Sequence, residues 1–96
     1  MTLFEFVRSK RAEILDLAAR HGARNIRLFG SIVRGEDNPN SDVDFLVQLE
    51  QDRSLMYHAA LLVDLEKLLG RPVDVAPEES LRPKLRERIL REAVPL

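Results

Sequence analysis

The sequence predicts a small α/β (α+β) domain in which helices alternate with three short strands. Apolar runs at 25–29, 42–49 and 73–76 are each bounded by turn-forming residues, as strands commonly are. The segments between these runs carry apolar residues at helical spacing. We therefore expect the order αβαβαβα, one domain over residues 1–96, and a mixed three-stranded sheet with about four packed helices.

The first helix and the first strand have clear boundary signals. Thr2 and Glu5 form the pattern of a capping box at the start of the helix. An apolar stripe at helical spacing follows, and His21-Gly22 is expected to end the helix because glycine suits the left-handed cap. The strand at 25–29 then places alternate side chains on opposite faces.

A polar crossing connects the first two strands. Gly30 ends the first strand, and Ser31 is expected to cap a short helix that runs to about Gly35. Residues 36–41 form a loop rich in acids and asparagine. The second strand, 42–49, has one apolar face, which comprises Val43, Phe45, Val47 and Leu49.

A long helix is expected from Ser54 to Leu69, after a turn over residues 51–53 and before a glycine C-cap. This helix has apolar residues on more than one side, so some of them could form a partner interface. The candidates are Leu55, Met56, Leu61 and Leu62.

The last strand and the last helix are short. The strand at 73–76 is closed by Pro77 and places Asp74 opposite its two valines. The last helix is expected to start at Ser80, with Pro83 tolerated in its first turn and Pro95 at its end. Its apolar side comprises Leu85, Ile89, Leu90 and Ala93.

Composition and charge narrow the class of function. The net charge is −1, so the chain lacks the basic field that direct nucleic-acid binding needs. The absence of cysteine excludes disulfides and thiolate metal sites. No apolar run could span a membrane and no signal peptide is visible, so we expect a cytoplasmic protein. A basic strip on the last helix suggests a solvated face, a docking surface for an acidic partner or an aid to nucleotide binding. Its members are Arg82, Lys84, Arg86, Arg88 and Arg91.

Three aspartates on apolar strands are candidate metal ligands. Asp42 and Asp44, two residues apart at the start of a strand, point to the same side of the sheet. Together with Asp74 they would repel one another unless a hard cation such as Mg²⁺ neutralised them. Two ions roughly 3.5–4 Å apart can clamp the attacking and leaving oxygens of a phosphoryl-type displacement. Asp42 and Asp44 would bridge the ions, and Asp74 would hold the second ion and could take the nucleophile's proton.

The Gly30-Ser31 turn fits a phosphate site beside these acids. Gly30 lets the backbone approach a phosphate, the Ser31 hydroxyl and the following amides favour anions, and Arg34 could supply a cation. Each feature alone has a simpler interpretation: a turn cap for the acid pair, an ordinary turn for Gly-Ser, and a surface acid for Asp74. A calcium loop, a dinucleotide fingerprint and a P-loop each lack required residues.

Gly30-Ser31, ten intervening residues and Asp42-x-Asp44 together resemble the signature of the DNA polymerase β-type nucleotidyltransferase superfamily. The likeness extends to Arg34-Gly35, to Ser41 before the first acid and to Asp74 in a later strand. The small size, the helix before the first strand and the ending RERILREAVPL are similar to the minimal nucleotidyltransferase (MNT) proteins. Those proteins are antitoxins encoded beside HEPN-domain proteins.

This resemblance implies a minimal nucleotidyltransferase fold and a Mg²⁺-dependent enzyme. Such an enzyme transfers AMP from ATP to a tyrosine of a cognate HEPN-type RNase toxin and so neutralises it. The resemblance assigns catalytic and metal-binding roles to Asp42, Asp44 and Asp74, and nucleotide contacts to Gly30, Ser31, Arg34 and Ser41. Two alternatives stay open: a non-catalytic module that occludes its partner, and a small-molecule nucleotidyltransferase of the antibiotic-modifying type. A chain of 96 residues is expected to leave the acceptor site to another protein.

Overall fold

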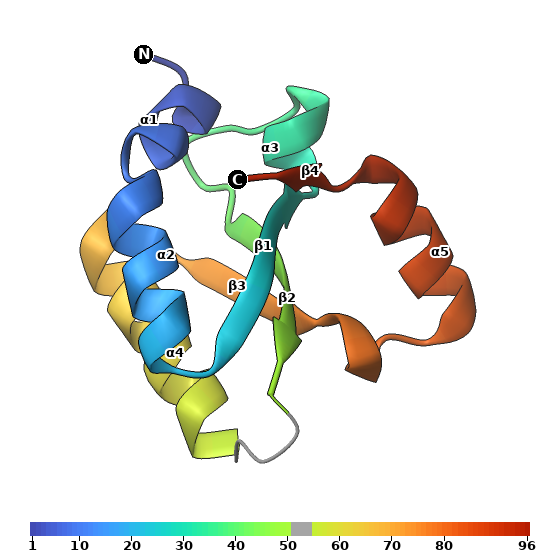
Figure 1. The fold of residues 1–96 in the computed structure, drawn as a ribbon. Helices are drawn as coiled ribbons and strands as arrows, with labels where there is room; N and C mark the ends of the chain where they lie inside the picture. The colour runs from blue at the N-terminus through green and yellow to red at the C-terminus, as the bar shows by residue number, and fades with distance from the viewer. Residues whose placement is uncertain (51–54) are drawn as a thin grey trace.

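The computed structural model describes residues 1–50 and 55–96 and shows a sheet flanked by helices (Figure 1). The elements, in chain order, are α1 (Leu3–Ser9), α2 (Arg11–Arg20), β1 (Ala23–Phe29), α3 (Ser31–Arg34), β2 (Val43–Leu49), α4 (Leu55–Leu69), β3 (Val73–Pro77), the 3₁₀ turn η1 (Glu78–Ser80), α5 (Pro83–Glu92) and β4 (Val94–Pro95). This arrangement confirms the predicted α/β class. The predicted turn over 51–53 and the Ser54 cap lie outside the described residues.

The sheet has the strand order β3-β2-β1-β4. β2 and β3 are parallel, whereas β1 is antiparallel to both β2 and β4, so the sheet is mixed as predicted. It has four strands where three were expected, because β4 pairs Val94 with Leu28 and Pro95 with Arg27. A two-residue strand cannot show an alternating pattern, and proline is tolerated on a sheet edge, so the sequence carried no signal for β4.

The predicted first helix is two helices. The capping box is present, since the Glu5 amide donates to Thr2 Oγ1 at 3.1 Å and the Thr2 amide donates to Glu5 Oε1 at 3.0 Å. The chain leaves helical geometry at Lys10, which ends α1 and precedes α2. Just before it, the Ser9 hydroxyl donates to the Phe6 carbonyl at 2.5 Å, a local bond that competes with the helical ladder.

Three helix ends test the boundary predictions. Gly22 follows α2 with a φ of +71°, which confirms the predicted left-handed cap. Gly30, and not Ser31, is the N-cap of α3, and Ser31 is its first helical residue. α5 begins at Pro83 and not at Ser80, which lies in η1. The reason is that the residue before a proline is pushed to extended backbone, which separates η1 from α5.

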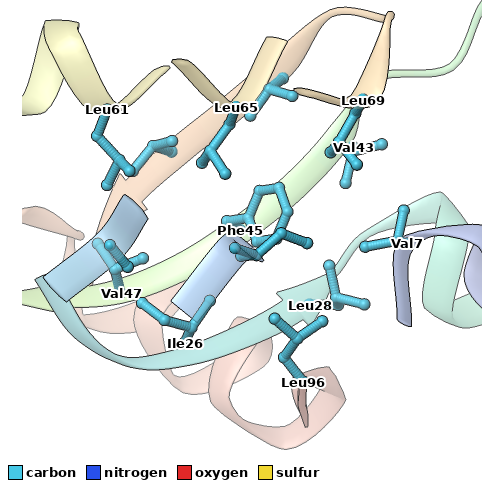
Figure 2. Packing of buried hydrophobic residues seen from close by; sticks show 14 of the residues in the cluster. Val7, Ile26, Leu28, Val43, Phe45, Val47, Leu61, Leu65, Leu69 and Leu96 are labelled. Carbon is cyan, nitrogen blue, oxygen red and sulfur yellow. The ribbon is translucent and has the colours of Figure 1, made fainter. Parts of the chain in front are cut away.

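The main core lies between one face of the sheet and the helices α1, α2 and α4. Figure 2 shows Phe45 at its centre, with leucines of α4 above the strands. Phe45 is fully buried, and burying such a side chain stabilises the fold by roughly 1.5–3 kcal/mol. The predicted apolar face of β2 is confirmed for three residues, whereas Leu49 is only partly buried. The core residues labelled in Figure 2 are Val7, Ile26, Leu28, Val43, Phe45, Val47, Leu61, Leu65, Leu69 and Leu96.

The opposite face of the sheet is bordered by α5 (Figure 1). Leu46 of β2 and Ile89 of α5 are buried, and neither belongs to the main core cluster. Leu85 and Leu90, which were predicted to lie on the apolar side of α5, are each 40% exposed. α5 therefore buries little apolar surface, and polar contacts must position it.

The predicted apolar surface of α4 is confirmed at one of its candidates. Met56 is 79% exposed, with Tyr57 and Val63 also exposed, whereas Leu61 is buried in the core. Leu62 is partly buried. A partner interface at this surface stays a prediction. None of the helices in the described residues is both long and apolar enough to cross a membrane.

Candidate active site

A cleft of about 320 Å³ lies between the sheet and α5, and two of the predicted acids line it. Asp44 of β2 and Asp74 of β3 are register partners on adjacent parallel strands, so both carboxylates lie on the same side of the sheet. Asp42 precedes Asp44 by two residues and lies on the exposed surface, close enough for its charge to act on Asp44. The structure thus brings Asp44 and Asp74 together in one cleft, and Asp42 lies outside the cleft lining but near Asp44.

Gly30 gives Asp44 its space. The backbone of Gly30 has φ +83° and ψ −157°, a conformation open essentially only to glycine. A Cβ atom at this position would lie 2.1 Å from Asp44 Oδ2. The requirement for glycine therefore comes from the carboxylate of the neighbouring strand, a role that adds to the predicted approach of a phosphate.

Asp44 is a partly buried carboxylate whose environment favours a bound cation. Burial, together with the negative charges of Asp74 and Asp42, raises the pKa of Asp44 to about 6. At neutral pH Asp44 is ionised, and the described residues include no cation within ion-pair distance of it. A divalent cation would supply the missing charge, so the residues present fit Mg²⁺.

The acids do not form a closed metal cage. Within residues 1–50 and 55–96, no three His, Cys, Asp or Glu side chains are gathered closely enough to hold an ion by themselves. Mg²⁺ commonly takes one or two protein carboxylates and completes its shell with water and substrate phosphates. The open arrangement suits a metal that arrives with a nucleotide. The metal-binding roles of Asp42, Asp44 and Asp74 stay predictions.

Arg34 lies in the cleft and is held by two carboxylates. Its Nε donates to Glu36 Oε1 and its Nη1 donates to Glu92 Oε1, each at 2.5 Å. These hydrogen bonds raise the pKa of Arg34 further. The guanidinium is therefore a positive charge held in the same cleft as Asp44 and Asp74, and its contact with a phosphate stays a prediction.

Glu92 is a site residue that the sequence analysis missed. It is the last residue of α5, lines the cleft, and accepts a hydrogen bond from the Gly30 amide at 2.8 Å through Oε2. Burial raises the pKa of Glu92, but the bonds from Arg34 and Gly30 outweigh burial and lower it below its ordinary value. An acid at the end of a basic helix was the available signal, and it does not reveal a contact across 62 residues.

The two predicted serines lie outside the cleft wall. Neither Ser31 nor Ser41 is among the described residues that line the cleft. Ser31 follows Gly30 at the start of α3 and is partly buried. Ser41 organises the loop before Asp42, because its Oγ accepts from the Asn38 amide at 2.8 Å and its carbonyl accepts from Arg71 at 3.0 Å. Nucleotide contacts by both serines stay predictions.

Arg88 is the member of the basic strip that lines the cleft in the described residues. The described part of the chain provides it with no hydrogen-bond or ion-pair partner. Arg86 instead bonds Glu78 at 3.3 Å, and Arg91 bonds Glu87 at 2.6 Å. With alternating basic residues, the sequence could not show which one faces the sheet until the true start of α5 was known.

Glu78 anchors the start of α5 to the sheet. Its Oε1 lies 2.7 Å from Arg27 Nη1, and both side chains are only 11% exposed. Its Oε2 accepts from Gln48 and Arg86, each at 3.3 Å. The hydrogen bond from Arg27 contributes most to lowering the pKa of Glu78. Ionic contacts thus hold α5 at both ends: Glu78 near its start and Glu92 at its close.

Several known proteins resemble this chain over nearly its whole length. The model of the nucleotidyltransferase domain matches residues 10–96. Protein adenylyltransferase MntA of Thermococcus cleftensis is 42% identical over 94 residues, covering 98% of this chain and 95% of that protein. A solved protein described as a minimal nucleotidyltransferase is 51% identical with a TM-score of 0.89, covering 100% of this chain and 97% of that one.

A further solved structure shares the fold. It is a complex of a tri-AMPylated HEPN toxin from Shewanella oneidensis with an MNT antitoxin. The likeness covers 92% of this chain and 69% of the matched chain, with a TM-score of 0.70 and 19% identity. At that identity the likeness is one of fold.

Proposed function

The chain belongs to the nucleotidyltransferase domain family, and we propose that it is a protein adenylyltransferase that serves as the antitoxin of a toxin–antitoxin pair. The observation that carries this proposal is the pair of register partners Asp44 and Asp74 in a cleft that also holds Arg34 and Arg88. The 42% identical relative, named protein adenylyltransferase MntA, supports a protein as the acceptor. The MNT antitoxin bound to an AMPylated HEPN toxin supports the class of partner.

We propose ATP as donor and Mg²⁺ as metal, held by Asp42, Asp44 and Asp74. When bound, the metal supplies charge neutralisation for the acids and the phosphates and orients the reacting groups. The unpaired, half-buried carboxylate of Asp44 is the observation that supports a cation here. Removal of the metal by a chelator is expected to stop transfer.

The residues of the chain divide the remaining work. In the transfer, the acceptor hydroxyl oxygen bonds to the α-phosphorus of ATP, the bond to the β-phosphate breaks, and pyrophosphate leaves. Asp74 is exposed beside Asp44, so we assign it the proton of the incoming hydroxyl. Arg34 and Arg88 line the cleft as positive charges for the triphosphate.

The acceptor that we propose is a tyrosine of a HEPN-type toxin. Leu81 and Leu85 line the same cleft, and Leu85 is 40% exposed. Such apolar surface can pack against the ring of a tyrosine while its hydroxyl reaches the polar end of the cleft.

The test is the intact mass of a co-purifying HEPN-type partner after incubation with ATP and Mg²⁺. The wild-type chain is expected to add the mass of AMP, and Asp44→Asn and Asp74→Asn are expected to slow this by on the order of 10²–10⁴-fold. Asp16→Asn is the matched control, since Asp16 is an exposed acid paired with Arg20 on α2. Neutralisation of the partner without any mass change would contradict the proposal and indicate occlusion.

A further inference from the structure

The C-terminal end of α5 contacts the Gly30–Arg34 turn through one side chain. Glu92 accepts from the Gly30 amide at 2.8 Å with one carboxylate oxygen and from Arg34 Nη1 at 2.5 Å with the other. The Glu92 side chain is 21% exposed, so the two bonds are partly shielded from water. Hydrogen bonds to ionised groups of this kind are shorter and stronger than neutral ones.

A carboxylate at this position has an electrostatic cost. The cleft already contains Asp44 and Asp74, with Asp42 nearby, and the charge of Glu92 adds to the repulsion that Asp44 experiences. A further negative charge opposes the binding of phosphate, so we expect Glu92 to have another role in the site. The two bonds of Glu92 indicate what it does, because they are the hydrogen bonds found between α5 and this turn in the described residues.

The contact with Gly30 fixes a residue on which Asp44 depends. The Gly30 backbone has φ +83°, and its lack of a Cβ leaves the space that the Asp44 carboxylate occupies. The bond from the Gly30 amide to Glu92 therefore fixes the backbone that lies against the Asp44 carboxylate. The contact with Arg34 acts on the cation, because Glu36 and Glu92 occupy Nε and Nη1 and leave the Nη2 donors for an anion.

We propose that Glu92 is a positioning residue for nucleotidyl transfer, which holds the Gly30 amide and the Arg34 guanidinium in the places that the nucleotide requires. This inference rests on the proposed function of the same site. It also links the cleft to the rest of α5, since Arg88 lies one turn before Glu92 and lines the same cleft. α5 thus supplies one cation directly and orients another.

The first test measures nucleotide affinity, which does not require transfer. Binding of AMP-PNP with Mg²⁺ to the full chain is measured by calorimetry for wild type, Glu92→Gln and Glu92→Ala. Glu92→Gln keeps an acceptor for Gly30 but loses the charge that orients Arg34, so we expect about tenfold weaker binding. Glu92→Ala loses both contacts and is expected to bind more weakly still. Glu87→Gln, on the exposed side of α5 and paired with Arg91, is the matched control and is expected to bind as wild type.

The second test separates positioning from a structural role. If Glu92 acts through Arg34, then Glu92→Ala weakens AMP-PNP binding less in the Arg34→Ala background than it does in wild type. Thermal unfolding of each variant shows whether the fold persists. Glu92→Gln binding as tightly as wild type, or more tightly, would overturn the proposal, the latter because Glu92 would then compete with the phosphates. The proposal would also be overturned if the losses of AMP-PNP affinity in the Arg34→Ala and Glu92→Ala variants were fully additive in the double variant and both single variants lost the same thermal stability.

These outcomes are distinct from failure of the proposed function. A wild-type chain that binds AMP-PNP but leaves its partner unmodified would contradict adenylyl transfer and leave the Glu92 comparison intact. Where transfer is observed, we expect Glu92→Gln to raise KM for ATP about tenfold, with a smaller change in kcat. A change in kcat alone would contradict positioning of the nucleotide.

Discussion

The two faces of β2 have opposite characters. One face presents Val43, Phe45 and Val47, all essentially inaccessible to water and packed among apolar side chains (Figure 2). The other presents Asp44 and Gln48 on either side of the buried Leu46; Asp44 lines the cleft, and Gln48 donates to Glu78. Because successive side chains of a strand alternate, one seven-residue strand serves both faces. Residues that stabilise the core and residues of the candidate site are therefore separated by a single position along β2.

The two faces are also held together differently. The core face depends on apolar burial, which is roughly proportional to area and tolerant of detail. The cleft face depends on particular polar contacts: Arg27 with Glu78, and Glu92 with Gly30 and Arg34. It also contains an ionised carboxylate without a partner in the described residues, a feature that favours function over stability.

The largest expected effect is on the core face. Phe45→Ala removes the central side chain of the core and is expected to lower the free energy of unfolding by about 3–5 kcal/mol, measured by urea denaturation. The matched truncation on the other face, Asp74→Ala, removes an exposed side chain and is expected to change stability by less than about 0.5 kcal/mol. Similar losses from both variants would contradict the division between the faces.

A smaller effect is expected from the polar anchor of α5. Glu78→Gln removes the charge that Arg27 faces and is expected to lower the free energy of unfolding by about 2 kcal/mol at pH 7. Arg27 Nη2 is already buried without a partner in the described residues, so loss of the Glu78 charge leaves the guanidinium with the bond from its Nε to the Asn25 carbonyl at 3.0 Å. The control is Glu87→Gln, an exposed helix pair expected to contribute less than about 0.5 kcal/mol.

The difference in unfolding free energy between wild type and Glu78→Gln is expected to depend on pH. The contacts of Glu78 lower its pKa in the fold below its ordinary value of 4.5. Its charge therefore stabilises the protein fully above that ordinary value, and the contribution is lost as the pH falls through the folded pKa. The gap between wild type and Glu78→Gln should narrow in acid. A gap that widens in acid would contradict the ionic anchor.

Gly30→Ala tests the contact between the turn and the acid. The added Cβ would lie 2.1 Å from Asp44 Oδ2, so one of the two groups must move. A displacement of this size is expected to slow AMP transfer on the order of 10²-fold, measured by intact mass of the partner. Gly35→Ala is the control, because Gly35 also has positive φ but its added Cβ would meet nothing within 4 Å. Equal losses of activity in both variants would attribute the effect to backbone strain.

The alternating pattern of β2 explains why the sequence revealed its two faces. Period-two spacing predicted the burial of Phe45, and the structure agrees. It also placed Asp42 and Asp44 on one side of a strand, but β2 starts at Val43, so Asp42 lies just before the strand. Glu92 could not be predicted, because its contacts join residues that only the folded chain brings together. Arg88 was indistinguishable from its basic neighbours until Pro83 fixed the start of α5. Local patterns thus indicated the strands and acids, and long-range polar contacts stayed hidden.

The ionised carboxylate of Asp44 is expected to lower the stability of the fold at neutral pH. The pKa of Asp44 is about 6 in the fold, against an ordinary value of 3.8. Because the folded pKa is raised, the fold favours the protonated acid. This stability is fully present below the ordinary value and is lost as the pH rises through about 6. After allowance for solvent screening, the loss at neutral pH is about 1–2 kcal/mol.

The most direct measurement is therefore the unfolding free energy of Asp44→Asn in EDTA at pH 7.5 and at pH 4, alongside its AMP transfer to the partner in Mg²⁺. We expect the variant to be about 1–2 kcal/mol more stable than wild type at pH 7.5, to lose that advantage near pH 4, and to transfer AMP on the order of 10²–10⁴-fold more slowly than wild type. Asp16→Asn should change neither property. An Asp44→Asn chain that is less stable than wild type at pH 7.5, or that modifies the partner at the wild-type rate, would contradict the assignment of chemistry to this face of β2.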